Sequence, residues 1–155
     1  MNQPDPILYI DADACPVRGE VFKVAARHSV PVVLVSNTFL RIPRHPLVSQ
    51  IVVAEGPDVA DDYIAERVDA GSIVITADIL LAERCLKSEA IVLAPNGKPF
   101  TKDSIGGQVA TRALMNDLRV GIGSENIGGP AAFTPADRNR FLQNLHEAVV
   151  QLLRR

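Results

Sequence analysis

The chain has 155 residues, of which 47% are hydrophobic and 22% charged, and its formal net charge is −2. This balance is that of an ordinary globular protein, and a chain of this length buries roughly two thirds of its unfolded surface. No stretch approaches the about 20 apolar residues of a membrane-spanning helix, and no signal peptide is recognisable. The two cysteines are too few for a disulfide framework. We therefore expect a soluble, cytoplasmic protein without a membrane partner.

Apolar runs and helix-like segments alternate along the first two thirds of the chain. Short buried strands are expected at residues 7–10, 32–35, 51–53, 73–75 and 91–93, where apolar and β-branched residues run together. Helices are expected at residues 17–28, 58–69 and 79–87, with Gly71 closing the second as a C-cap. Two prolines between residues 39 and 46 indicate a loop.

The last third predicts a helical extension that begins at about residue 104. A helix is expected over residues 104–118, and four glycines within residues 121–130 predict a mobile or ligand-approaching loop. Thr134, Pro135 and Asp137 predict the start of a last helix with an apolar stripe. Continuous apolar strands alternating with helices predict one three-layer α/β/α domain over residues 1–155, with a central, mainly parallel sheet of about five strands.

Aspartates follow two of the expected buried strands. Asp11 and Asp13 come after residues 7–10, and Asp78 follows residues 73–75. Ligands of open parallel sheets bind beyond the carboxyl ends of the strands, so these side chains should meet at one edge. Asp61 lies early in the helix expected at residues 58–69, at the border of its buried face.

Carboxylates gathered in one place repel one another unless protons or cations intervene. Mg²⁺ and Mn²⁺ prefer oxygen ligands of this kind. The pattern therefore predicts a metal-dependent acidic site for phosphate ester chemistry. Its candidate catalytic residues are Asp11, Asp13, Asp61 and Asp78. Asp11, Asp61 and Asp78 are the candidate metal ligands.

Each acid also has a purely structural interpretation. Asp13 or Asp78 could simply cap the helix that follows it. Asp58, Asp61 and Asp62 could stabilise the dipole of their helix, with Asp58 the best candidate for the N-cap.

Cys15 stands beside the acids and invites an interpretation as a nucleophile. Nearby carboxylates raise a thiol pKa and disfavour the thiolate, so structural packing is the better interpretation. Cys85 is expected in the core, and the three histidines show no zinc-binding spacing.

Four segments of the chain resemble the bacterial YaiI/YqxD family, which has no established function. They are DADACPV at residues 11–17, DVAD at 58–61, IVITAD at 73–78, and GGP at 128–130 ahead of residues 137–138. The resemblance extends from about residue 7 to residue 150.

That family is similar to PIN-like domains, whose nuclease members hold Mg²⁺ or Mn²⁺ on a cluster of acids. The resemblance implies a PIN-like fold in which Asp11, Asp61 and Asp78 are the acids that hold the metal. Thr76 then supplies the hydroxyl two residues before the last acid, and Asp103 is the candidate for a further acid of the usual set.

The leading functional hypothesis is a nuclease or phosphodiesterase in which one or two metals activate water and stabilise the leaving oxygen. Single-stranded RNA or DNA is the candidate partner. Neutralising four aspartates leaves 16 basic and 14 acidic residues, which permits such a partner without indicating it. The candidate substrate-binding residues are Thr76, Ser36, Asn37 and Arg112, with Lys98, Lys102 and Arg119 as further candidates for phosphate contacts.

Two other classes stay open. The start of the DADACPV string also resembles haloacid dehalogenase-type phosphatases, with Asp11 as covalent nucleophile, Asp13 as general acid and Ser36 in the second motif. No lysine stands shortly before Asp78 to complete that pattern. The third class is a non-catalytic module that binds RNA or protein, although an aromatic content of 5% disfavours base stacking. The oligomeric state stays open.

Overall fold

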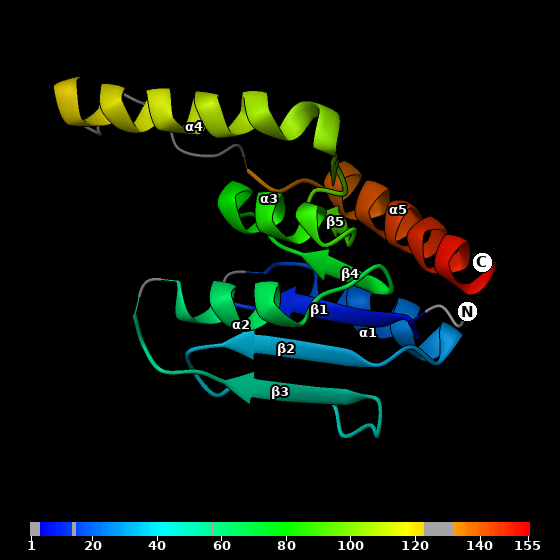
Figure 1. The fold of residues 1–155 in the computed structure, drawn as a ribbon. Helices are drawn as coiled ribbons and strands as arrows, with labels where there is room; N and C mark the ends of the chain where they lie inside the picture. The colour runs from blue at the N-terminus through cyan, green and yellow to red at the C-terminus, as the bar shows by residue number, and fades with distance from the viewer. Residues whose placement is uncertain (1–3, 14, 57, 123–131) are drawn as a thin grey trace.

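The computed structural model describes residues 4–13, 15–56, 58–122 and 132–155. Within them strands and helices alternate as far as β5, except that β3 follows β2 without a helix between them, and after the short β6 two long helices complete the chain (Figure 1). The strands are β1 (Ile7–Asp11), β2 (Val32–Ser36), β3 (Val48–Val52), β4 (Ser72–Ile75), β5 (Ile91–Leu93) and β6 (Pro99–Phe100). The helices are α1 (Arg18–His28), α2 (Val59–Arg67), α3 (Ile79–Lys87), α4 (Lys102–Ile122) and α5 (Pro135–Leu153).

One six-stranded sheet has the order β3-β2-β1-β4-β5-β6. Its first five strands are parallel, and β6 pairs antiparallel with β5. The predicted central parallel sheet is confirmed, with one strand more than expected because a two-residue strand leaves no periodic signal. The chain runs outward from β1 to β3 and then returns to the other side of β1. The strand order thus reverses between β1 and β4, where open sheets of this kind bind ligands.

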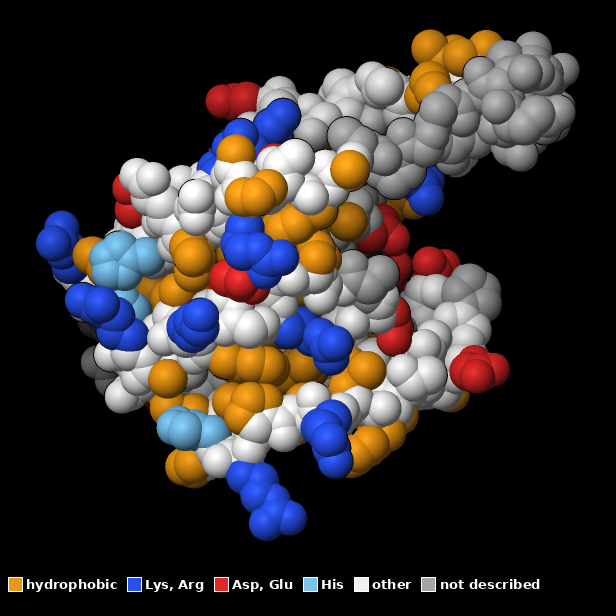
Figure 2. All heavy atoms as spheres, turned by 180° about the vertical axis from the view of Figure 1, so that it is seen from behind, with side chains coloured by type: hydrophobic (Ala, Val, Ile, Leu, Met, Phe, Trp, Pro, Cys, Tyr) orange, Lys and Arg blue, Asp and Glu red, His pale blue; other side chains and the backbone are white. Residues whose placement is uncertain are grey.

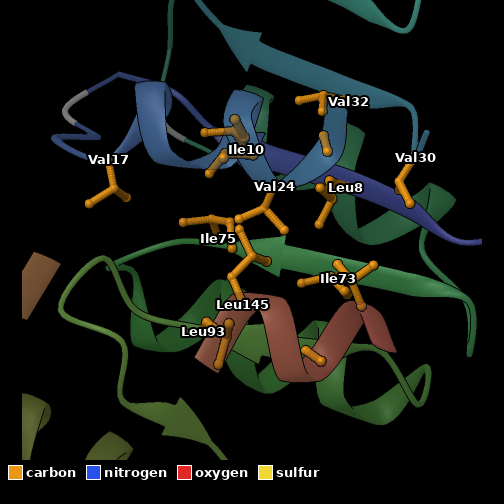
Figure 3. Packing of buried hydrophobic residues seen from close by; sticks show 14 of the residues in the cluster. Leu8, Ile10, Val17, Val24, Val30, Val32, Ile73, Ile75, Leu93 and Leu145 are labelled. Carbon is orange, nitrogen blue, oxygen red and sulfur yellow. The ribbon is translucent and has the colours of Figure 1, made fainter. Parts of the chain in front are cut away.

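Helices cover both faces of the sheet, which confirms the three-layer architecture. Alternate strand residues such as Leu8, Ile10 and Ile75 pack against α1 and α5 (Figure 3). The intervening residues, among them Tyr9 and Val74, pack against α2, α3 and the start of α4. Because both faces are buried, these strands are apolar throughout rather than alternating. In the described residues no helix is long and apolar enough to cross a membrane.

The expectation that Gly71 caps a helix is wrong. Helix α2 ends at Arg67, with Val68 in extended conformation as the C-cap. Gly71 is instead needed for close packing, because a Cβ there would lie 2.8 Å from the Pro4 carbonyl oxygen.

Helix α4 is longer than its pattern predicted. It begins at Lys102 and continues to Ile122, where its outer part stands away from the sheet (Figure 1). The predicted glycine-rich loop therefore begins later than residue 121, and its residues 123–130 lie outside the described part of the chain.

Helix α5 begins as predicted. Thr134 Oγ1 accepts a hydrogen bond from the Asp137 amide, and the Asp137 carboxylate accepts one from the Thr134 amide. Phe141, Leu145 and Val149 are fully buried against α1 and the sheet. The region expected as an extension thus supplies one of the helices that cover the core.

Candidate acidic site at the sheet edge

Asp11 and Thr76 face each other across the two central strands. Asp11 is the last residue of β1, and Thr76 follows the last residue of β4. The buried Thr76 hydroxyl donates a hydrogen bond of 2.8 Å to Asp11 Oδ2 and accepts one of 3.0 Å from the Asp78 amide. One threonine therefore links both acids at the place where the strand order reverses.

Asp78 is the N-cap of α3, as its structural interpretation predicted. Its Oδ1 atom accepts hydrogen bonds from the Leu80 and Leu81 amides at 2.8 and 3.2 Å. These bonds hold the carboxylate in place through one oxygen, and the described hydrogen bonds do not use Oδ2. Capping and ligand binding are thus compatible for this residue.

Helix α2 presents two neighbouring carboxylates to different surroundings. Asp62 forms an ion pair of 2.7 Å with Arg84 of α3. Asp61 lies near Asp11 and Asp78, and its pKa is raised to about 6 by burial and by these two charges. Asp58 is the N-cap of α2, as predicted, with φ of 66°, although its side chain makes no capping hydrogen bond.

Burial and mutual repulsion also disturb Asp11. Burial is the main cause of its raised pKa, with further contributions from Asp78 and Asp13, while the Thr76 hydrogen bond acts in the opposite direction. The carboxylate of Asp78 is therefore close enough to oppose the ionisation of both Asp11 and Asp61. A cation placed among them would relieve this repulsion.

The donor chemistry suits a hard divalent cation, but the side chains are not already arranged around one. Among the described residues, no group of three or more His, Cys, Asp or Glu side chains has the geometry of a metal site. In the described hydrogen bonds Asp11 Oδ1, Asp78 Oδ2 and both Asp61 oxygens are unused. Binding would therefore require these side chains to rotate until their oxygens converge on one point.

Asp13, Ser36 and Asn37 form a separate group at the ends of β1 and β2. The exposed Asp13 carboxylate accepts a 3.2 Å hydrogen bond from the Asn37 amide nitrogen of the backbone. The Asn37 side-chain nitrogen, turned toward Asp13, also lies 3.2 Å from both carboxylate oxygens. Ser36 is fully buried and donates to the Thr38 carbonyl at 2.6 Å, which closes its hydroxyl to a ligand.

The predicted phosphate-binding residues are dispersed. Arg112 lies on exposed α4 and lines a groove with Ile79, next to Asp78. Lys98 lines a second pocket, whereas Lys102 is paired with Glu89 of the α3–β5 connection. The Arg119 side chain lies outside the described part of the structure. The further acid, Asp103, is exposed in the first turn of α4.

Acidic side chains gather at the edge toward which the strands point, in a hollow beside the outer part of α4 (Figure 2). Cys15 is half-buried near this edge, and burial raises the pKa of its thiol, which supports packing over nucleophilic chemistry. Cys85 is buried in the core, as expected, with a pKa raised to about 12.

Two features of the site lie beyond what the sequence patterns predicted. Arg84 distinguishes Asp62 from Asp61, but it is 22 residues away along the chain and no local signal connects them. Arg140 and Phe133, which line the pocket that contains Lys98, come from the region of α5. Their place depends on how that helix docks, which no motif indicates.

Residues 9–151 match the family described as "Uncharacterized BCR, YaiI/YqxD family". A UPF0178 protein of Sphingopyxis alaskensis is 58% identical over 149 residues, which cover 96% of each chain. A UPF0178 protein of Azorhizobium caulinodans is 54% identical over 98% of this chain and 95% of its own. Another, from Rhodopseudomonas palustris strain TIE-1, is 55% identical over 96% of this chain and 92% of its own. No solved structure matches the chain.

Proposed function

This chain belongs to the YaiI/YqxD family of bacterial proteins, and from its acidic site we propose that it is a PIN-like, Mg²⁺- or Mn²⁺-dependent phosphodiesterase that cleaves single-stranded RNA or DNA. The observation that carries the proposal is the crowding of Asp11, Asp61 and Asp78 where the strand order reverses. Asp61 lies in the first turn of α2 but forms no ion pair among the described residues. Its pKa is raised by burial and by the charges of Asp78 and Asp11, which a cation would neutralise.

In this proposal the three aspartates hold the cation. The bound cation supplies activation of water and stabilisation of the leaving oxygen. Thr76 fixes the orientation of Asp11 through its 2.8 Å hydrogen bond, and the first turn of α3 fixes Asp78. The Asp61 carboxylate takes part in none of the described hydrogen bonds or ion pairs, so of the three ligands it is the least restrained.

The phosphatase alternative receives less support from the surroundings of Asp11. Its second-motif residue, Ser36, is buried and donates to a backbone carbonyl, and Asp13 is occupied by Asn37. Ser36 is therefore not free to assist a nucleophilic Asp11, and the Asp13 carboxylate is held toward Asn37. A phosphoryl group trapped on Asp11 would nevertheless establish that alternative.

The free thiols of Cys15 and Cys85 agree with a reducing compartment, so we include a cytoplasmic location in the proposal.

Titration calorimetry with Mn²⁺ tests the site directly. We expect the native chain to bind Mn²⁺ and Asp61→Asn to bind it at least tenfold more weakly, because a ligand carboxylate is lost. The matched control is Asp62→Asn, which removes the same charge from the next residue of α2 but acts on the ion pair with Arg84. Equal affinity in Asp61→Asn and Asp62→Asn would refute the metal site.

Hydrolysis of single-stranded RNA and DNA is then measured with and without Mn²⁺. Cleavage that needs the metal and falls sharply in Asp78→Asn supports the nuclease. Metal binding without turnover of any nucleic acid or phosphodiester would favour a non-catalytic binding module.

A further inference from the structure

A pocket of about 710 Å³ opens directly beside the acidic site. Ala77 and Ile79, the two neighbours of Asp78, contribute to its lining, as does Pro16 from the connection after β1. The pocket continues between the β5–β6 turn and the start of α5. It has the size of a small-molecule site, and two of its lining residues flank Asp78 in the chain.

The wall formed by the β5–β6 turn, residues 94–98, is held rigidly against α5. The Asn144 side chain donates a 2.7 Å hydrogen bond to the Gly97 carbonyl, and Arg140 donates one of 3.2 Å to the Asn96 carbonyl. Gly97 has φ of 89°, and a Cβ there would lie 2.6 Å from the Phe141 backbone nitrogen. The turn is therefore preformed, and Lys98 is carried on a fixed support.

The lining combines flat apolar surface with positive charge. Three prolines and two phenylalanines, Phe100 and Phe133, supply the apolar part. Lys98 and Arg140 supply two positive charges against the single carboxylate of Asp137, which already accepts a hydrogen bond from Arg140. Gln108 and Asn96 add amides. The pocket is thus net positive beside a site that is strongly negative.

We propose that this pocket binds one nucleotide of the substrate strand, with its base against the Phe133 side and its phosphate near Lys98. This inference rests on the proposed function, since it assigns the substrate subsite of the same acidic centre. A nucleotide combines what the lining offers, because its base has an apolar face with hydrogen-bonding edges and its phosphate is anionic. An uncharged apolar ligand would leave Lys98 without a role.

A groove on the far side of Ile79 extends this subsite. It shares Ile79 and Gln108 with the pocket and continues along α4 past Gly107 to Arg112. A chain bound in the pocket can therefore continue past Ile79 along α4 toward a second arginine, Arg112. This continuity favours a polymer over a free metabolite as the natural occupant.

Binding of adenosine 5′-monophosphate, measured by calorimetry in EDTA, tests the pocket without the metal. We expect Lys98→Glu to weaken binding about tenfold or more, since a contact between charged groups is replaced by repulsion. Lys87→Glu makes the same charge change on an exposed lysine at the far end of α3 and should leave binding unchanged. Unfolding midpoints confirm that both variants are folded.

Inorganic phosphate and adenosine are the two comparison ligands. We expect each to bind more weakly than the nucleotide, and Phe133→Ala to weaken the nucleotide and adenosine but not phosphate. Phosphate binding as tight as the nucleotide would reduce the pocket to an anion site and overturn the proposal. So would nucleotide binding that is absent or insensitive to Lys98→Glu.

The two proposals fail separately. Nucleotide binding in the pocket without Mn²⁺ binding would refute the metal-dependent enzyme and leave the pocket standing. Mn²⁺ binding that depends on Asp61, without nucleotide binding, would leave the acidic site and refute the pocket.

Discussion

Asp61 and Asp62 show how neighbouring residues of one type acquire different chemistry. Both lie in the first turn of α2, and both favour the helix dipole there. Asp62 reaches Arg84 and is exposed, whereas Asp61 turns toward Asp11 and Asp78 and is half-buried. The spacing of the sequence marked Asp61 as a border residue of the buried face. Its partners could not be predicted, because they come from β1 and α3.

The raised pKa of Asp61 predicts a pH-dependent stability of the metal-free protein. Its pKa rises from 3.8 to about 6 on folding, so the folded state holds the proton more tightly than the unfolded state between these values. The free energy of unfolding therefore falls as pH rises through this window. Asp61→Asn should remove that loss and be more stable than the native chain at pH 7, by roughly 1 kcal/mol after allowance for solvent screening.

Urea unfolding in EDTA at pH 3.5 and pH 7 measures the effect. The gain of Asp61→Asn over the native chain should be present at pH 7 and largely absent at pH 3.5. Asp62→Asn should show no gain at pH 7, because its carboxylate is paired with Arg84. A gain of the same size at both pH values would contradict the electrostatic origin.

At the scale of elements, residue patterns predicted the long or strongly apolar segments well. The α3 boundaries, Ile79 and Lys87, agree with the expectation, and the parallel strands β1, β2, β4 and β5 lie where their apolar runs do. The two residues of β6 and the outer turns of α4 have no such signal. Gly71 was misread as a cap because its close neighbour, Pro4, is distant in sequence. The local sequence predicts where an element lies, but the role of a residue near its end depends on contacts with segments distant in sequence.

The start of α5 provides a test at this scale. Thr134→Ala removes the hydroxyl that accepts the Asp137 amide at 3.1 Å, so one helix N–H loses its partner. We expect the free energy of unfolding to fall by about 1 kcal/mol. Thr111→Ala is the matched control, since Thr111 is exposed within α4, where alanine is the better helix former. Chemical denaturation of both variants should show a loss for the first alone, and equal losses would contradict the role of the cap.

For the whole molecule, the class of fold followed from alternating elements, but the strand order did not. Parallel strands with helical crossovers predict a sheet covered on both faces. They do not say that β4 returns to pair with β1 rather than with β3. That return places Thr76 against Asp11, and it makes the candidate site out of two motifs 65 residues apart. The rule that ligands bind beyond the carboxyl ends of parallel strands predicted that the acids share one edge of the sheet. That they are neighbours at this edge could not be predicted without the strand order.

The position of α5 decides how the molecule unfolds. Leu145 is fully buried between α5, α1 and the sheet, whereas Leu114 on the outer part of α4 is 58% exposed. If α5 belongs to the single core, Leu145→Ala should lower the free energy of unfolding by about 2–5 kcal/mol and shift the entire transition. Leu114→Ala deletes the same atoms from a solvent-facing helix and should change the free energy of unfolding by under about 0.5 kcal/mol.

Circular dichroism of the helices and the fluorescence of Tyr9 and Tyr63 should follow one common transition in both variants, because those tyrosines pack on the opposite face of the sheet. An early loss of helix in Leu145→Ala that leaves the tyrosine signal unchanged would mean that α5 folds as an appendage rather than as a layer of the core.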